Sequence, residues 1–548
     1  MSTAPRVNPA TVRRHLAWWA VAVVPLGFLG LFFLWPVASV LVRGLFEDWD
    51  VAAAWDVLSS SRTLEAIWTT LYLAALGTFG SLAIGLPAAW ALGRFEWRGR
   101  TTVRAILTTP FVLPTLVVAA AFSALFSSSG LLGSWGLDQT PAAIVLALTF
   151  FNVSVVIRLV GGAWETMPSS LAAAARTLGA SRARAYWHVT LPALAPTIAS
   201  AAAVVFLFCS TSFALVLVLG GSRVRTVETE IYLQVNQFLD LRAASVLALV
   251  QVAIVALALW ISARAGGARG FTQSVQGRRG PRRGEKAAVV GSLVPAMVLL
   301  VLPLSALVER SLRVGDGYGL DHYLAIFSVP ARNILPVSVV QATLNSVVTA
   351  ALATVMVAVM GVLITGLVAR RTRRGSVLEA LTMLPLGVSA VVVGLGMLLT
   401  LNTTVLGVDL RASWWLVPIA QAIVALPLMV RAMLPAARAI APGLRAAAAS
   451  LGASPWRVRW HVDAVLLRPA LAASLAFAFA IAMGEFGATA FVARPDRPTL
   501  TTAIARLLSR PGAENVGLAY ASAVMLAVLV AAVMLVSERW RARSGGGL

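Results

Sequence analysis

The residue types that most often carry enzyme or metal chemistry are few in this 548-residue sequence. Lys286 is the only lysine, and it does not stand in the Gly-Lys-Ser/Thr context of a phosphate-binding loop. Cys209 is the only cysteine, which excludes a disulfide or a multi-thiolate metal site within one chain. The four histidines show no metal-ligand spacing: His15, His188, His322 and His461. The sequence therefore predicts no enzyme, no metal site and no cofactor bound by this chain.

Glu485 is the one acidic residue deep in a long apolar run, in the stretch GEFGATAFVA. A carboxylate surrounded by hydrocarbon is costly, and it usually faces a cavity or a partner group. We expect Glu485 either to line a polar path or to serve helix packing.

The strongest pattern is a polar, arginine-bearing segment that occurs twice, at 169–196 and at 442–469. At a constant offset of 273 residues, the second copy repeats these residues of the first: Ala173, Ala174, Ala175, Leu178, Gly179, Ala180, Ser181, Arg184, Trp187, His188, Val189, Leu194 and Pro196. Both copies lie between long apolar runs. We therefore expect each to form a structured element at a membrane surface.

The order of residues within each copy predicts a helix, a glycine turn and a second short helix. The alanines that precede Gly179 favour a helix, and glycine is the usual residue just past a helix end. Ser181 is a good cap for the next helix. Its counterpart Ser454 is followed by Pro455, the residue preferred at a first helical position.

These spacings resemble the EAA signature of bacterial ABC importer permeases, in which Glu-Ala-Ala is followed by Gly and later by Leu-Pro. Two differences stand out: Ala173 and Ala446 replace the signature glutamate, and Ala464-Val465 replaces the second Leu-Pro. The resemblance implies that each copy is a coupling helix inserted into a cleft of a separate ATP-hydrolysing subunit. The residues expected to couple are Ala173, Ala174, Ala175, Gly179, Arg184, His188, Pro192, Ala446, Ala447, Ala448, Gly452, Arg457 and His461.

Composition indicates an integral membrane protein. Hydrophobic residues make up 59% of the chain and charged residues 12%, with a mean hydropathy of +0.85. About twelve apolar runs are long enough to cross a bilayer: 17–42, 66–92, 105–126, 142–160, 197–220, 243–263, 287–308, 341–368, 377–400, 414–432, 468–493 and 517–537. Pro110, Pro114 and Pro385 should bend the third runs of each half.

Arginine placement predicts the topology. The net charge of +22 comes from arginines in alternate short loops and at both ends of the chain, so both termini are expected in the cytoplasm, and nucleic-acid binding is not expected. The repeat divides the chain into a first half at 1–263 and a second at 287–548. Between them, 264–286 is rich in glycine and arginine and predicts a flexible cytoplasmic linker. The expected fold is all-α, with two homologous six-helix halves.

The fifth apolar runs carry a further resemblance. The Glu485 stretch resembles molybdate and sulfate permeases, and the stretch at 210–232 resembles fused thiamine and ferric-iron permeases. These permeases belong to one superfamily, in which the fifth helix lines the translocation path. The resemblance therefore implies path-lining roles for Ser212, Phe213, Glu485 and Phe486.

The whole pattern resembles a fused permease of a type I ABC importer in a bacterial cytoplasmic membrane. The expected partners are lipid, two copies of an ABC ATPase that binds the ATP, and a periplasmic or lipid-anchored substrate-binding protein. Ferric iron or thiamine is the expected cargo, ahead of oxyanions and polyamines. The alternatives are an ion-coupled secondary transporter with two six-helix halves and a non-transporting membrane scaffold. The few intramembrane charges and the paired loops disfavour the transporter, and the repeat disfavours the scaffold.

Overall fold

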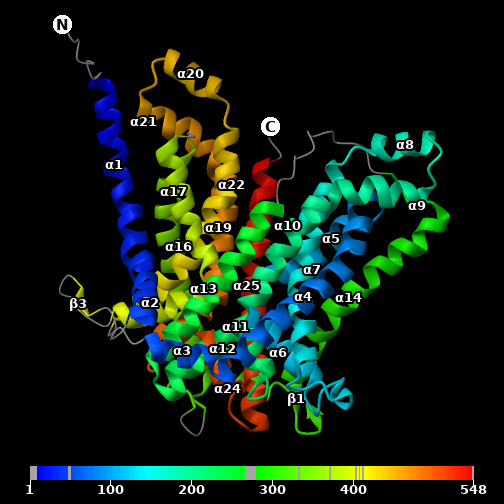
Figure 1. The fold of residues 1–548 in the computed structure, drawn as a ribbon, viewed down its shortest axis with the longest axis vertical. Coiled ribbons are helices and arrows are strands. Elements are labelled where there is room, and N and C mark those ends of the chain that lie inside the picture. The colour runs from blue at the N-terminus through cyan, green and yellow to red at the C-terminus, as the bar shows by residue number, and fades with distance from the viewer. Residues whose placement is uncertain are drawn as a thin grey trace. The chain divides into compact units, whose positions relative to one another are not determined.

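The computed structural model describes residues 9–46, 51–265, 279–330, 334–369, 372–401, 404–405, 408–409 and 413–545. In these ranges the strands are confined to two short antiparallel hairpins. β1 (Arg313–Val314) pairs with β2 (Gly317–Tyr318), and β3 (Thr404–Val405) pairs with β4 (Val408–Asp409). Helices dominate the remainder, as the sequence predicts (Figure 1).

Over the described residues, ten helices are long and apolar enough to cross a bilayer. Two bent helix pairs raise the number to twelve if each pair counts as one span, which agrees with the prediction of about twelve. The ten are Trp18–Gly44, Ser61–Arg94, Pro141–Thr166, Ala183–Ser210, Leu241–Ser262, Arg283–Leu312, Val339–Val368, Leu416–Ala439, Pro455–Gly484 and Ala513–Ser537.

The two bent pairs are the third runs of each half, where the sequence predicts kinks at proline. α5 (Arg100–Thr108) and the 3₁₀ turn Thr109–Phe111 meet α6 (Thr115–Phe126) at 99°. α17 (Arg373–Met383) and the 3₁₀ turn Leu384–Gly387 meet α18 (Ala390–Thr400) at 98°. Pro114 occupies the cap position of α6 and has no N–H to donate, and a proline disfavours helical backbone in the residue before it. The preceding helix therefore ends before Pro114, which permits the bend.

The fifth runs are broken, whereas the sequence indicates continuous spans at 197–220 and 468–493. α10 (Leu191–Ser210) is followed by α11 (Phe213–Gly220), and α22 (Ala464–Gly484) is followed by α23 (Thr489–Val492). In the first half the hydroxyls of Ser210 and Thr211 both donate to the Leu207 carbonyl, at 2.9 and 3.0 Å. Such hydroxyls compete with the backbone bonds of a helix, which is a physical reason for the break at this point.

Contacts divide the chain into two compact units. Unit 1 contains Met1–Val42, Pro336–Thr502 and Val528–Leu548, and unit 2 contains Arg43–Leu335 and Ala503–Ala527. These units differ from the halves drawn by the sequence repeat. The first helices of the two halves are exchanged, because α1 (Pro9–Leu29) belongs to unit 1 and α14 (Arg283–Leu312) belongs to unit 2.

The same three helices form the centre of each unit. In unit 2, α4 (Ser61–Arg94), α7 (Pro141–Thr166) and α10 pack against one another. Their repeat counterparts in unit 1, α16 (Val339–Val368), α19 (Leu416–Ala439) and α22, do the same. A Cβ on Gly85 would lie 2.7 Å from Val156, so glycine lets α4 and α7 approach closely.

The remaining elements complete the two units. Unit 1 includes α20 (Pro442–Ser450) and α21 (Pro455–Val458), together with most of α2 (Trp35–Phe46). Unit 2 includes α3 (Val51–Ser59), α8 (Ser169–Thr177), α9 (Arg182–Ala185), α12 (Val227–Leu233), α13 (Leu241–Ala265) and α15 (Asp321–Leu324). The boundary between the units passes through α24 (Leu500–Leu508) and α25 (Ala513–Gly545).

The segment predicted as a flexible linker, 264–286, is shorter in the structure. α13 continues to Ala265 and α14 begins at Arg283. Arg279 forms a β-bridge with Phe95, and its carbonyl accepts from the Glu96 N–H at 3.0 Å. Residues 266–278 lie outside the described ranges. The end of the predicted linker, just before α14, is therefore held by backbone contacts of Arg279 with Phe95 and Glu96.

Candidate coupling loops and translocation path

The first repeated segment folds as helix, glycine turn and helix, as the sequence predicts. α8 ends in a pair of backbone bonds: Gly179 donates to the Arg176 carbonyl at 3.1 Å, and Ala180 donates to the Ala175 carbonyl at 3.0 Å. Gly179 has φ +87°, the left-handed conformation that such a helix end requires. A side chain there would be strained, which explains the glycine.

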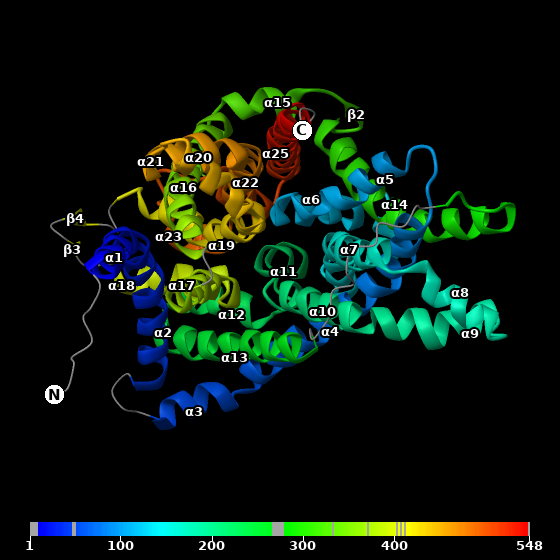
Figure 2. The same ribbon diagram turned by 90° about the horizontal axis from the view of Figure 1, so that it is seen from above.

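The second segment has the same backbone. Gly452 has φ +82° and donates to the Ala449 carbonyl at 3.0 Å, while Ala453 donates to the Ala448 carbonyl at 3.0 Å. In unit 2, α8 and α9 extend beyond the end of α7 (Figure 2), and in unit 1, α20 and α21 follow α19 (Figure 1). Identical local sequence therefore produces the same turn in both units.

Serine caps start the second helix of each loop, as predicted. Ser181 Oγ accepts from the Arg184 N–H at 3.2 Å, and Ser454 Oγ accepts from the Arg457 N–H at 3.4 Å. A π-helical turn follows in both copies, Tyr186–Thr190 and Arg459–Asp463.

The repeated histidines lie in these π-helical turns. His188 Nδ1 lies 3.1 Å from the Arg184 carbonyl, and His461 Nδ1 lies 3.1 Å from the Arg457 carbonyl. Because a carbonyl only accepts, Nδ1 is the donor in both bonds. Each ring is therefore tied to its own loop and helps to hold the π-helical turn.

Most of the predicted coupling residues lie on the surface. In the first copy Ala173, Ala174, Gly179, Arg184, His188 and Pro192 are exposed, and Ala175 is half-buried. In the second copy Ala446, Ala447, Gly452, Arg457 and His461 are exposed, and Ala448 is half-buried. These residues are available to a partner, and their coupling role stays a prediction.

The sequence reasoning missed the leucine that stands just before each glycine. Leu178 is 88% exposed and Leu451 is 89% exposed, so each loop presents an aliphatic side chain at its turn. Trp187 and its counterpart Trp460 are also exposed. The signal was available, because an apolar residue at the tip of a polar loop is repeated at the offset of 273.

The predicted path residues lie at the two breaks of the fifth runs. Ser212 is half-buried between α10 and α11, and the buried Phe213 packs on Tyr232 with ring centroids 5.3 Å apart. In unit 1, Glu485 and Phe486 are buried between α22 and α23. The repeat therefore places the same kind of helix break in both units.

The Glu485 carboxylate forms hydrogen bonds with residues three and four positions after it in the chain. Oε1 accepts from the Ala488 N–H at 2.7 Å, and Oε2 accepts from the Thr489 N–H at 2.9 Å and from the Thr489 hydroxyl. The Glu485 carbonyl accepts from the Thr501 hydroxyl at 3.1 Å. Glu485 thus stabilises the start of α23, which supports its packing role; its place on the path stays a prediction.

The sequence reasoning did not single out two buried acids that lie after the break in the fifth run of the first half. Glu228 and Glu230 on α12 are each 1% exposed. Arg62 Nε lies 2.7 Å from Glu230 Oε1, which also accepts from Gln234 at 2.9 Å. Arg62 is far from α12 in the sequence, so no local pattern signals this pairing.

The short helices α12 and α24 both follow threonines that form hydrogen bonds in their first turn. Thr226 donates its N–H to Thr229 Oγ1 at 2.9 Å, and Thr499 Oγ1 accepts from the Thr502 N–H at 3.4 Å. A hydroxyl from the second span of the same unit caps each helix further. Thr70 accepts from the Val227 N–H at 3.0 Å, and Ser346 accepts from the Leu500 N–H at 2.7 Å.

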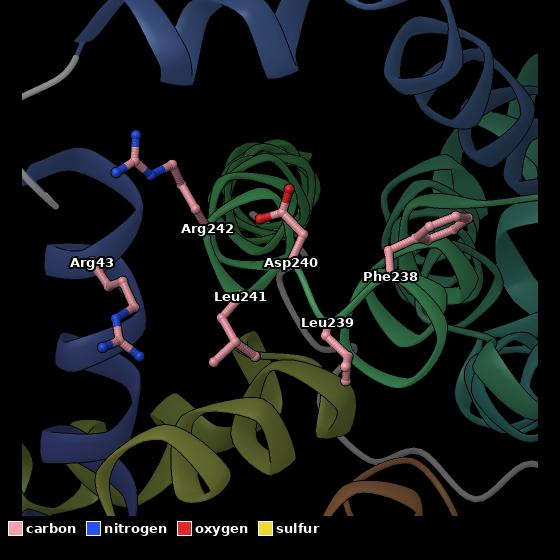
Figure 3. A pocket seen from close by; sticks show the side chains of 6 residues that line it. All are labelled: Arg43, Phe238, Leu239, Asp240, Leu241 and Arg242. Carbon is pink, nitrogen blue, oxygen red and sulfur yellow. The ribbon is translucent and has the colours of Figure 1, made fainter.

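A shallow pocket opens where α13 begins (Figure 3). It is lined by Arg43, Phe238, Leu239, Asp240, Leu241 and Arg242. Asp240 Oδ1 accepts from the Ala243 N–H at 2.8 Å, so this carboxylate caps α13. The counterparts of Asp240 and Arg242 in the second half are Ala513 and Asn515, which do not repeat the charges. The charged lining of the pocket is therefore not repeated at these two positions of the second half.

Comparison with known proteins identifies the family. The profile of the binding-protein-dependent transport system inner membrane component family matches residues 82–266. The chain is 30% identical over 236 residues to the molybdenum transport system permease protein of Mycobacterium tuberculosis, which covers 41% of this chain and 87% of that protein. It is 29% identical over 242 residues to the sulfate transport system permease protein of Escherichia coli K12, which covers 42% of this chain and 86% of that protein.

A third relative matches nearly the whole chain. The thiamine transport system permease protein of Brucella suis biovar 1 is 26% identical over 552 residues, which cover 97% of this chain and 98% of that protein.

The duplicated helical fold with two matching loops defines a two-half membrane permease. The chain belongs to the binding-protein-dependent transport system inner membrane component family, as a non-enzymatic, multi-pass permease subunit of an ABC importer in the inner membrane. This membership confirms the resemblance seen in the sequence and decides against the ion-coupled transporter.

Proposed function

We propose that two ATPase subunits bind this permease from the cytoplasm, one at the loop from α8 to Thr190 and one at the loop from α20 to Asp463. The exposed Leu178 and Leu451 carry this proposal. Each leucine stands at the tip of a rigid glycine turn, on a segment whose other exposed residues are mostly polar or small. A cleft in a partner would remove such a side chain from water, and burial of a leucine stabilises a complex by about 1.5–3 kcal/mol.

ATP is bound and hydrolysed on those partners in this proposal. Binding of ATP draws the ATPases together and moves the two loops, and the halves of the permease rock to open the path outward. A substrate-binding protein, periplasmic or lipid-anchored, delivers the solute to the opposite face. The loops and both termini are then cytoplasmic, in keeping with the distribution of arginine.

The breaks in the fifth runs are the proposed path. Irregular backbone at membrane depth is tolerated where it is buried in protein or lines a cavity. Both breaks are at matching places of the repeat, and the residues there are Ser212, Phe213, Glu485 and Phe486. We assign Glu485 the task of holding the break in unit 1 open as a turn, with Ser212 and the two phenylalanines nearer to the solute.

Thiamine and ferric iron are the proposed cargoes, because the stretch at 210–232 resembles fused permeases for these two solutes. Similarity over nearly the full length to a thiamine transport system permease supports thiamine as the first to test. Sulfate and molybdate complete the panel, because permeases for both ions are similar to one stretch of the chain.

The deciding experiment measures ATP hydrolysis by the permease and its ATPase, reconstituted in lipid. A binding protein loaded with thiamine, ferric iron, sulfate or molybdate is added in turn. We expect one loaded protein to stimulate hydrolysis, which names the cargo. If no ATPase associates with the purified permease, the docking role of the loops is wrong.

A further inference from the structure

The helix that leads into each coupling loop is joined to the bent third run by an ion pair near its last turn. In unit 2, Glu165 lies on the last turn of α7, four residues before α8 begins. Its carboxylate accepts from Arg100 Nη2 at 2.7 Å and from Arg104, and both arginines lie on α5. Arg100 is 5% exposed and also donates Nε to the Leu92 carbonyl at 2.7 Å.

Unit 1 contains a corresponding pair. Arg438 lies on the last turn of α19, four residues before α20 begins. Its Nη2 donates to Glu379 Oε2 at 2.7 Å, and Glu379 lies on α17. Both side chains are about one-third exposed.

The two ion pairs have opposite polarity. Glu165 and Arg438 occupy the same position of the repeat, at the offset of 273, and carry opposite charges. Glu165 pairs with Arg100 and Arg104 on α5, and Arg438 pairs with Glu379 on α17, so attraction is retained although the signs of the paired residues are reversed. The partners do not correspond in the repeat, since Arg373 and Val377 stand at the positions of Arg100 and Arg104. Both units therefore keep an ion pair between the same two helices, although the paired residues differ. This indicates that the connection between these helices has a function.

Each ion pair lies where the helix that carries a coupling loop meets the bent third run of its unit. A coupling helix moves the permease only if its base is firmly joined to the helices that must move. α7 and α19 form that base, and the ion pairs join them to α5 and α17. Those helices turn by 99° and 98° into α6 and α18.

We propose that Glu165 with Arg100 and Arg104, and Glu379 with Arg438, are positioning residues that transmit displacement of the coupling loops to the bent third runs. This role rests on the proposed docking of ATPases at the loops. Without the link, a loop moves while the bent run stays behind, and ATP is hydrolysed without transport.

The pair in unit 1 is the better one to test. Loss of Glu165 would leave the buried Arg100 without its carboxylate, which threatens the fold itself. Glu379 and Arg438 are more exposed, and either can be changed at a smaller cost. Glu379→Arg and Arg438→Glu each place like charges together. The double variant restores attraction and copies the polarity of unit 2.

The readout is the amount of solute transported per ATP hydrolysed, in vesicles containing the full chain, its ATPase and its binding protein. We expect each single variant to lower this ratio roughly three- to tenfold, and the double variant to restore it to within about twofold of the wild type. Lys286→Glu is the control, because it reverses an exposed charge outside both ion pairs and should leave the ratio unchanged.

The inference is overturned if the single variants transport with the wild-type ratio, or if the charge swap does not restore it. Should the single variants fail to fold, Glu379→Gln together with Arg438→Gln replaces them, and a wild-type ratio in that variant overturns the inference. Failure of the proposed function is distinct, because then the wild-type permease itself shows no stimulated hydrolysis.

Discussion

The two coupling loops have the same backbone but are held by different side chains. In the second loop, Arg445 Nε lies 2.7 Å from Asp463 Oδ1, which joins α20 to the π-helical turn. The first loop has Ala172 and Thr190 at these repeat positions. There Tyr186 stacks on Trp164 of α7, with ring centroids 6.5 Å apart. The first loop is thus anchored to the helix before it, and the second is locked within itself.

The comparison distinguishes the features that both loops share from the side-chain contacts that only one of them has. The glycine turn, the serine cap and the histidine bond are identical in both copies, so the path of the backbone is the shared requirement. The ion pair holds the π-helical turn to α20, and the aromatic stack holds the corresponding turn to α7, so each restrains the second part of its loop by a different contact. Variants of the shared residues should therefore affect both loops equally, whereas variants of the locks should affect one.

The largest effect is expected from Gly179→Val and Gly452→Val. Both glycines have left-handed φ values, and a β-branched residue there costs at least about 1–2 kcal/mol and redirects the chain. We expect each variant to lower binding-protein-stimulated ATP hydrolysis by about tenfold or more, and the double variant to abolish the stimulation. Gly443→Ala is the matched control, since Gly443 lies in α20 with open space around it. An active Gly452→Val permease would show that the loops are not equivalent.

The next effect concerns the exposed leucines. Leu178 and Leu451 are almost fully exposed, so in Leu178→Ser and Leu451→Ser the melting temperature should stay within about 1–2 °C of the wild type. Affinity for the ATPase should fall by about ten- to a hundredfold in each, because one buried leucine contributes about 1.5–3 kcal/mol. Titration of the ATPase against nanodisc-embedded permease measures this. Undiminished affinity in both variants would show that the leucines do not enter the partner.

A smaller effect, confined to the second loop, is expected from Arg445→Ala. The Arg445–Asp463 pair is about one-quarter to one-third exposed, so its loss should cost about 0.5–1 kcal/mol. Hydrogen–deuterium exchange should quicken at 442–463 and stay unchanged at 169–190. High salt should weaken the wild-type ion pair and reduce the difference between the two proteins. Equal acceleration in both loops would contradict the assignment of this lock to the second loop.

The smallest effect is expected from Trp164→Leu, which removes the stack on Tyr186 while keeping an apolar side chain on α7. An aromatic pair of this kind contributes about 0.5–1.5 kcal/mol. Exchange should quicken about twofold to tenfold at 186–190 and remain unchanged in the second loop. The Trp456–Trp460 stack in the second loop offers the reciprocal test, since Trp456→Leu should leave the first loop unaffected.

Local features of the site follow from sequence because their causes lie within a few residues. The alanines, glycine and serine of each loop specify helix, turn and cap, and Pro114 specifies the bend in a third run. The repeat indicated two related halves, and the apolar runs indicated about twelve spans. The fifth runs were the exception, since an apolar run with Ser210, Thr211 or Glu485 inside it is also compatible with a continuous helix.

The sequence by itself therefore determined the membrane class, the two loops and the bends, which arise from hydropathy and short-range backbone preferences. It also indicated the family, through the spacing of the repeated motif. Only the tertiary structure decided the rest: the exchange of α1 and α14 between the compact units, the burial of Glu230 against Arg62, and the reversed ion pairs at Glu165 and Arg438. Each depends on which distant helices meet, and one chain's residue order does not encode that in any local pattern.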